Sequence, residues 1–112
     1  MGVKLVSQGE EVIAFINGDI DHHSASDIRK EIDAITEEKW PQLLKLDFSS
    51  VQFMDSSGIG LIMGRYKLMQ RLGGKLLIVN IPSHIIRLIK LSGLSELGII
   101  KREDETIDAT HK

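Results

Sequence analysis

A run of small, oxygen-bearing residues near the middle of the chain is the segment best suited to chemistry. Asp55, Ser56 and Ser57 stand together, followed by Gly58 and Gly60. Each of the first three offers a side-chain oxygen that can accept a hydrogen bond from a free backbone N–H at the start of a helix. One cap needs only one such oxygen, and a phosphate on a serine there would suit the helix dipole. The plain alternative is a helix cap and nothing more.

Three glycines in the same helix raise a second question. Gly58, Gly60 and Gly64 each cost up to ~1 kcal/mol relative to alanine inside a helix. Gly60 and Gly64 are four residues apart and share one face, so another backbone or a partner could approach closely there. Tight packing of the helix on its own sheet explains the glycines equally well, and the sequence leaves both explanations open.

The hydrophobic pattern of this helix predicts two faces. One stripe is expected to pack on the sheet, and the other face carries leucines where solvent is expected. A single exposed leucine is ordinary, but beside the two serines the second face is a plausible docking surface for a partner. The sheet-facing stripe consists of Ile59, Ile62, Met63, Tyr66 and Met69, and the outer face consists of Leu61, Gly64, Arg65 and Leu68.

A second polar segment lies earlier in the chain, where Asp19 and Asp21 precede His22 and His23. Two acids and two histidines in five residues invite interpretation as a metal site. Adjacent histidines cannot easily point into one site, however, and no distant pair of ligands is evident. We therefore expect a polar turn with no metal.

Other catalytic patterns are missing from the sequence. There is no cysteine to serve as a nucleophile or zinc ligand, no glycine loop followed by Lys-Ser or Lys-Thr, and no Gly-x-Ser-x-Gly. No histidine is placed by sequence as a base for Ser56. The sequence therefore predicts a protein that is not an enzyme and needs no cofactor.

Composition limits the partners and the compartment. The 112 residues carry a net charge of −2 with a pI of about 6.1, so no overall positive field attracts nucleic acid or anionic lipid. The apolar stretches fall short of the ~20 residues that a membrane span needs, and the N-terminus does not resemble a signal peptide. We expect one cytoplasmic domain over residues 1–112 that binds neither nucleic acid nor membrane.

The elements that position these residues alternate between strands and helices. A hairpin of two strands comes first, and Ser24 with Asp27 resembles a capping box at the first helix. Because later strands alternate with helices, they are expected to pair in parallel. The predicted class is α/β, with a small mixed open sheet, an antiparallel N-terminal hairpin at its edge and about four helices. Strands are expected at 3–7, 11–17, 43–48, 75–80 and 98–101, helices at 24–36, 56–72 and 85–91, and a polar helix or tail at 103–112.

Several of these segments together resemble one family, the anti-sigma factor antagonists, which are single domains of the STAS fold. The likeness runs in order through about residues 1–102, and Asp-Ser-Ser-Gly-Ile-Gly after a strand is its most specific part. Two of the segments make the chain more similar to the sporulation antagonists than to the general stress-response ones. The segments are Gly18-Asp-Ile-Asp-His-His-Ser-Ala, Phe53-Met-Asp-Ser-Ser-Gly-Ile-Gly, Gly64-Arg-Tyr-Lys, Gly73-Gly and Leu91-Ser-Gly-Leu.

The resemblance implies a cycle in which partners are exchanged. The unphosphorylated antagonist binds a nucleotide-bound anti-sigma factor that is also a serine kinase, and the sporulation sigma factor F is released. The kinase phosphorylates the antagonist, the two separate, and a metal-dependent serine phosphatase restores the active form. The family acceptor falls on Ser56, and Asp21 matches a loop acid that contributes to partner binding.

A wider partner surface is expected around the acceptor. Rival hypotheses are an antagonist of a general stress anti-sigma kinase, a weak nucleotide-binding or hydrolysing domain, and a scaffold without switching. The expected surface consists of Asp21, Asp55, Ser56, Ser57, Gly58, Gly60, Leu61, Gly64, Arg65 and Leu68.

Overall fold

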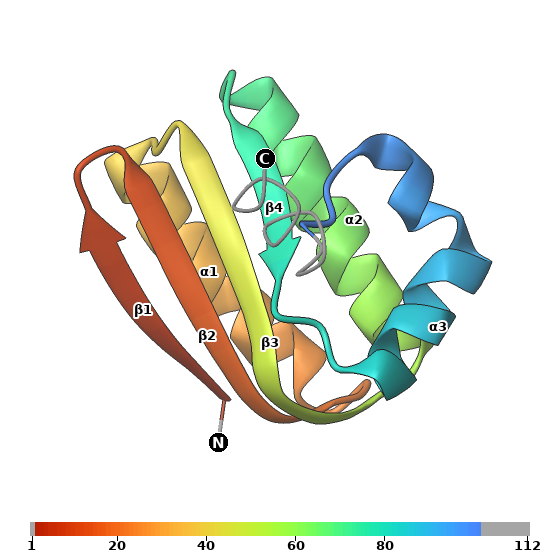
Figure 1. The fold of residues 1–112 in the computed structure, drawn as a ribbon. Coiled ribbons are helices and arrows are strands. Elements are labelled where there is room, and N and C mark those ends of the chain that lie inside the picture. Colours follow the sequence, from red (N-terminus) through yellow and green to blue (C-terminus); the bar gives the residue numbers. More distant parts are fainter. Residues whose placement is uncertain (1, 102–112) are drawn as a thin grey trace, which may run out of the picture.

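The computed structural model describes residues 2–101, which form strands and helices in alternation after an initial hairpin (Figure 1). Each change of element falls where the sequence changes its hydrophobic period or reaches a glycine or proline. The elements are β1 (Gly2–Gln8), β2 (Glu11–Ile20), α1 (Ala25–Lys39), β3 (Leu43–Met54), α2 (Ser56–Arg71), β4 (Lys75–Val79), α3 (Ser83–Ser92) and the 3-10 turn η1 (Leu94–Leu97).

The four strands form one mixed sheet in the order β1-β2-β3-β4. β1 and β2 are antiparallel and joined by a tight turn at Gly9, whose φ of 61° suits glycine. β3 and β4 run parallel to β2. α1 and α2 lie behind the sheet in the view of Figure 1. The predicted α/β class with a mixed open sheet and an antiparallel edge hairpin is confirmed.

Two strands differ most from their predicted bounds. β3 was expected to end near Phe48 but continues to Met54, because it stays paired with β2 as far as Ile20. The last strand, expected at 98–101, is reduced to a single parallel bridge between Ile100 and Ile78. The residues before Ile99 do not extend this strand, because they form η1 and the left-handed Gly98 (φ 71°). The described residues contain three α-helices and η1, and the helix or tail expected at 103–112 lies outside them.

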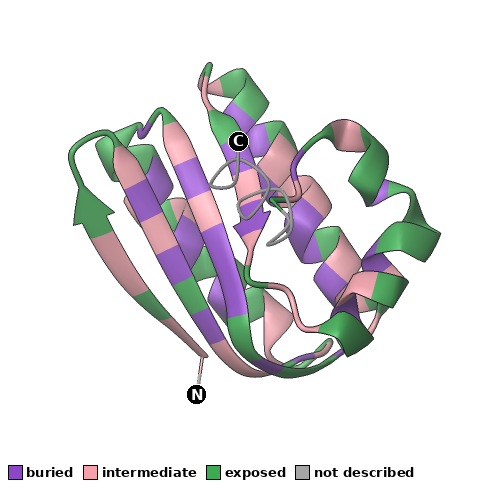
Figure 2. Ribbon diagram, viewed as in Figure 1, coloured by how far each residue is buried: buried purple, intermediate pink, exposed green. Residues whose placement is uncertain are grey.

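The core lies between the sheet and the helices that cover it (Figure 2). Alternate residues of β2 and β3 point into it, as the period of two in a strand requires. None of the helices within residues 2–101 is long and apolar enough to cross a membrane. The core side chains with no solvent exposure include Val12, Ala14, Ile16, Ile20, Leu44, Leu46 and Phe48 from the sheet, with Ile32, Ile62 and Ile89 from the helices.

Candidate functional site

The start of α2 leaves one serine free. Asp55 is the N-cap, and its Oδ1 accepts a hydrogen bond from the backbone N–H of Ser57 at 2.7 Å. Ser57 is half-buried, whereas Ser56 is exposed and its hydroxyl makes no hydrogen bond to residues 2–101. Because the carboxylate of Asp55 does the capping, the Ser56 hydroxyl is available to another molecule.

The loop after β2 reaches the same end of the sheet. The last pair of residues in the parallel ladder joins Ile20 to Met54, and the N–H of Asp55 donates to the carbonyl of Ile20 at 3.1 Å. The residue after Ile20 is Asp21, so both segments singled out from the sequence lie at the carboxyl ends of neighbouring strands. Open α/β sheets usually place their sites there.

Asp21 organises its own loop. Its Oδ1 accepts hydrogen bonds from the backbone N–H groups of His23 at 2.9 Å and Ser24 at 3.0 Å. The bond from Ser24, with that from His23, holds the pKa of Asp21 below its ordinary value. Asp21 therefore carries a negative charge at neutral pH in a fixed turn beside the start of α2.

The capping box expected at α1 is wrong. Ser24 occupies the N-cap position, but its hydroxyl donates to the carbonyl of Asp19 at 2.8 Å and makes no cap bond. Asp27 makes no side-chain bond to this loop within residues 2–101. Since Asp21 accepts the bond from the N–H of Ser24, the loop side chains brace the turn instead of the helix end. Among residues 2–101 there is no group of three or more His, Cys, Asp or Glu side chains that could hold a metal ion.

The three glycines of α2 have different surroundings. A Cβ on Gly58 would collide with the side chain of Met54 and lie 3.3 Å from Ile20, so this glycine permits tight internal packing. A Cβ on Gly60 or Gly64 would meet nothing within 4 Å. Internal packing therefore explains Gly58, whereas Gly60 and Gly64 leave open space on the molecular surface.

The outer face predicted for α2 is wrong in three of its four residues. Leu61 and Leu68 are each 4% exposed and Arg65 is 6% exposed. The helix is buried on two sides, because it packs on α1 as well as on the sheet. The hydrophobic stripe in the sequence predicted packing on the sheet but not packing on α1. Of the predicted outer face, only Gly64 is open to solvent in part.

The face of α2 that does meet solvent begins at Ser56. Ser56, Gly60 and Gly64 lie four residues apart, and Lys67 continues the row. We call these four residues the glycine face of α2. Two half-buried apolar side chains, Ile59 and Met63, flank the open space beside it. Together the row gives a partner close access to the helix backbone below Ser56.

One exposed aromatic residue belongs to the same region. Phe53 is 52% exposed and lies two residues before Asp55, opposite Asp19 in the parallel ladder. Sequence reasoning missed it as a surface residue, because β3 was expected to end near Phe48. Neighbouring residues of a strand face opposite sides of the sheet, and here Met54 is buried and Phe53 is exposed. A prediction that extended the strand to Met54 would therefore have placed Phe53 on the surface.

Comparisons with known proteins identify the family and the fold. The STAS domain family model matches residues 3–110. The anti-sigma F factor antagonist of Paenibacillus polymyxa is 34% identical over 86 residues, which cover 77% of this chain and 74% of that protein. The anti-sigma-B factor antagonist of Bacillus subtilis (strain 168) is 32% identical over 101 residues, covering 89% and 91%.

The similarity extends to solved structures. The unphosphorylated form of the anti-sigma factor antagonist SpoIIAA superposes with a TM-score of 0.78 at 26% identity, over 98% of this chain and 96% of that one. The phosphorylated form of Bacillus SpoIIAA gives a TM-score of 0.71 at 27% identity, over 97% and 99%. The same fold thus occurs in a protein known both with and without its phosphate.

Proposed function

The chain belongs to the STAS domain family, and on that premise we propose that it is an anti-sigma factor antagonist controlled by phosphorylation of Ser56. Its unphosphorylated form binds an anti-sigma factor that is also a serine kinase and carries bound nucleotide. Binding releases the sporulation sigma factor F. The kinase then phosphorylates Ser56, the complex separates, and a metal-dependent serine phosphatase regenerates the active form.

One observation carries this proposal. The hydroxyl of Ser56 is exposed at the first turn of α2 and makes no hydrogen bond within the described residues, while Asp55 caps the helix. An acceptor serine must reach the γ-phosphate of ATP in a kinase site, which a capping serine could do only by giving up its cap. Ser57 is the poorer candidate, since it is half-buried and its N–H is held by Asp55.

Charge explains why phosphorylation separates the partners without a change of fold. A phosphate adds about −1.5 to −2 charges beside Asp55. In the free protein, water and the free N–H groups at the start of α2 accommodate that charge. In a complex the phosphate would lose its water next to Asp55, Asp21 and the partner's own nucleotide phosphates. Repulsion and desolvation then favour release.

The proposed partner surface follows the exposed residues. It comprises the loop acid Asp21, the start of α2 at Asp55, Ser56 and Ser57, and the glycine face with its flanking apolar side chains. Phe53 adds an exposed apolar contact, and aromatic anchors commonly dominate such interfaces. Leu61, Arg65 and Leu68 are buried and are left out, and Gly58 contributes only by letting the helix approach Met54 of β3.

The chemistry of the cycle belongs to the partners. ATP and its metal ion are held by the kinase, and the phosphatase holds its own metal, so this chain is their substrate and ligand. Its relatives are named as antagonists of anti-sigma factors, which are regulators and not catalysts. We therefore assign no catalytic residue to it.

A second candidate is the antagonist of a general stress kinase. The Bacillus subtilis anti-sigma-B factor antagonist is 32% identical and aligns with more of this chain than the Paenibacillus polymyxa sigma F antagonist does. The two possibilities share Ser56 and differ in the kinase. Titration of the purified protein against each anti-sigma kinase with bound ADP distinguishes them by affinity.

The phosphorylation assay tests the proposal as a whole. The protein is incubated with the anti-sigma kinase and ATP, and the phosphosite is mapped by mass spectrometry. We expect one phosphate on Ser56 and loss of the complex after its addition. Phosphorylation confined to Ser57, or a complex that survives phosphorylation unchanged, would refute the assignment.

A further inference from the structure

The second half of the domain has an unusual charge. Residues 56–95 contain no Asp or Glu and six Lys or Arg. Arg65 is buried against Asp33, but Lys67, Arg71 and Lys75 are exposed near the end of α2 and the start of β4. Although the whole chain is slightly acidic, the end of α2 and the start of β4 present positive charge to solvent, whereas the exposed Glu96 of η1 carries the opposite charge.

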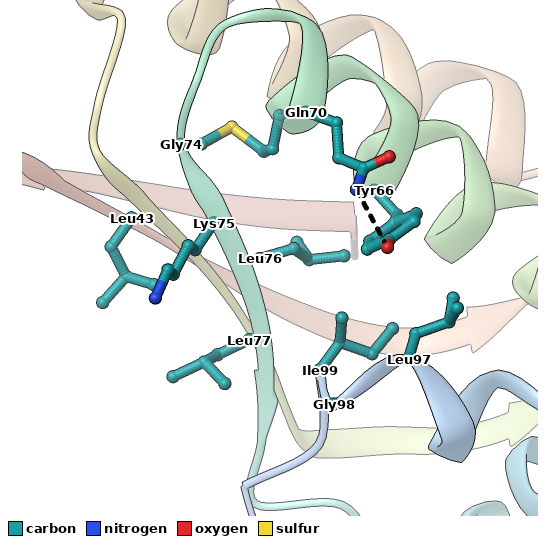
Figure 3. A pocket seen from close by; sticks show the side chains of 11 residues that line it. Leu43, Tyr66, Gln70, Gly74, Lys75, Leu76, Leu77, Leu97, Gly98 and Ile99 are labelled. Atoms are coloured by element: carbon teal, nitrogen blue, oxygen red, sulfur yellow. Dashed lines mark hydrogen bonds between the residues drawn. The ribbon is translucent and has the colours of Figure 1, made fainter.

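An open groove lies in the same region, between α2, β4 and the segment that follows η1 (Figure 3). Its volume is about 690 Å³. Tyr66 and Gln70 come from α2, Leu76 from β4 and Leu97 from η1, while Lys75 stands on the other side of β4. The phenol of Tyr66 accepts a hydrogen bond from the Gln70 amide at 3.0 Å, so the α2 wall of the groove is braced.

The outer edge of β4 is paired at Ile78 but has no hydrogen-bond partner at Leu76 among residues 2–101. The N–H of Lys75 donates to the carbonyl of Gln42, on the β3 side. The backbone groups of Ile78 face the outer side of β4, away from β3. Its N–H donates to the carbonyl of Ile99 at 2.6 Å, and its carbonyl accepts from the N–H of Lys101 at 3.0 Å. Since backbone groups alternate along a strand, Leu76 directs its N–H and C=O to the same outer edge as Ile78. No loop residue within 2–101 bonds to them.

The groove is separate from the phosphorylation site. Ser56 begins α2, and Tyr66 and Gln70 lie in its last turns. At 1.5 Å per residue, Tyr66 lies about 15 Å and Gln70 about 21 Å along the helix from Ser56. A molecule in the groove would therefore leave the start of α2 free, and both surfaces could be occupied together.

We propose that this groove binds an acidic, extended segment of a partner protein, whose backbone pairs with the outer edge of β4 at Leu76. The free N–H and C=O of Leu76 fit an extended backbone, as in other cases where a peptide joins a sheet edge. Leu76, Leu97 and Tyr66 accept an apolar side chain of the segment. Lys75, whose side chain lies on the face of β4 opposite to Leu76, meets carboxylates that the segment directs to that face, and Lys67 and Arg71 are exposed nearby on α2.

Other classes of ligand fit the groove less well. A lipid surface or a polynucleotide would use the positive charge but offers no regular alternation of donor and acceptor for Leu76. The chain itself carries acids at Glu103, Asp104, Glu105 and Asp108. Occupation by these residues is a distinct outcome that the experiment must separate from binding of a partner.

The test uses two short peptides and the full chain. Acetyl-EIEVE-amide is the acidic probe and acetyl-KIKVK-amide is its matched control, with binding followed by amide NMR shifts and hydrogen exchange. We expect the acidic peptide to shift residues 75–77 and 97–99 and to protect the amide of Leu76. The amide of Leu77 already faces β3 and should change little. The basic peptide should bind at least about tenfold more weakly.

Variants make the result specific. Lys75→Glu should weaken binding of the acidic peptide about fivefold, whereas Lys4→Glu, an exposed change on β1, should leave it unchanged. Equal binding of both peptides, shifts confined to the Ser56 end, or no binding overturns the proposal. A full-length variant with Gln or Asn at 103, 104, 105 and 108 provides the last control. Peptide binding seen only in that variant would mean that the chain's own acidic residues occupy the groove. It would also overturn the proposal that a partner protein binds there.

Discussion

Arg65 of α2 and Asp33 of α1 form an ion pair, with 2.8 Å between Nε and Oδ1. The Arg65 side chain is 7% exposed and that of Asp33 is 21% exposed. Burial lowers the pKa of Arg65 and raises that of Asp33, and in each case the partner's charge opposes the shift. Arg65 Nε and Nη1 and Asp33 Oδ1 are all buried, and none of them makes a hydrogen bond of good geometry in the described part of the chain. The ion pair therefore joins α2 to α1, but its two charges are largely shielded from water.

A double-mutant cycle on this pair should be strongly non-additive. Asp33→Ala leaves the buried guanidinium without its partner and should cost roughly 3 kcal/mol of unfolding free energy. Asp33→Leu combined with Arg65→Met removes both charges and should be near neutral or stabilising. Urea unfolding measures each variant. The half-exposed pair of Lys45 and Glu11, 2.7 Å apart, is the control and should give at most about 1 kcal/mol. A double variant as unstable as Asp33→Ala would contradict the account.

The pH dependence of Asp33→Asn has a definite sign. Because burial raises the pKa of Asp33 above its unfolded value, ionisation costs more in the folded state than in the unfolded one. The contribution of Asp33 to stability is therefore full below pH ~3.8 and is lost as the pH rises through the folded pKa. The stability of Asp33→Asn relative to the wild type should rise over that window. A relative loss instead would mean that Arg65 outweighs burial and lowers the pKa.

The order and pairing of the elements could be predicted from the sequence, since strand alternation and helix caps are local signals. The hairpin, the parallel strands and the start of α2 at Ser56 were all predicted in this way. The burial of α2 was not, because a hydrophobic stripe shows that a helix packs somewhere but not on how many neighbours. Arg65 looked like a surface residue, and its partner Asp33 lies far away in the sequence with no local pattern to link them.

The candidate site divides in the same manner. The exposed Ser56 and its capping neighbour Asp55 follow from the types of residue at a helix start. The difference between Gly58, which packs on Met54, and Gly60, which faces open space, depends on tertiary contacts. Glycine spacing in the sequence could not reveal it.

Alanine at two of these glycines should have opposite effects on stability. Gly60→Ala adds a methyl group where nothing lies within 4 Å, so better helix propensity should raise the unfolding free energy by up to ~1 kcal/mol. Gly58→Ala forces Met54 to move and should destabilise the protein despite the same gain in propensity. Thermal unfolding of the two variants compares them. A loss of stability in Gly60→Ala would show that its surface is not open.

A larger side chain at Gly64 should affect binding more than folding. Gly64→Leu places an isobutyl group on the glycine face, where it would meet open space in the free protein and the kinase in the complex. We expect nearly unchanged thermal stability and clearly weaker binding in calorimetric titrations with the ADP-loaded kinase. If the main effect is a large fall in melting temperature, the proposed partner surface lies elsewhere.

Ser56→Ala should abolish phosphorylation and spare both the fold and kinase binding. Asp55 holds the cap, so loss of the Ser56 hydroxyl should change stability by less than about 0.5 kcal/mol. Asp55→Ala is the matched comparison and should cost about 1 kcal/mol, because it removes the bond to the N–H of Ser57. Phosphate incorporation by the kinase and urea unfolding give the two readouts. Undiminished incorporation in Ser56→Ala would move the acceptor to Ser57.

Ser56→Asp should imitate the phosphorylated state only in part. Aspartate supplies one negative charge and two acceptor oxygens, whereas phosphate supplies up to two charges and three oxygens. At the start of α2 the new carboxylate should stabilise the free protein by ~0.3–1 kcal/mol through the helix dipole, offset by repulsion from Asp55. Binding to the kinase should nevertheless fall, because the carboxylate must lose water beside a second acid.

The expected order of affinity for the ADP-loaded kinase is wild type first, Ser56→Asp second and phosphorylated protein last. Calorimetric titration of the three forms measures it, and thermal unfolding of each form establishes that the fold is intact. Equal affinity for all three forms of the Ser56 series would mean that charge at Ser56 does not control the complex.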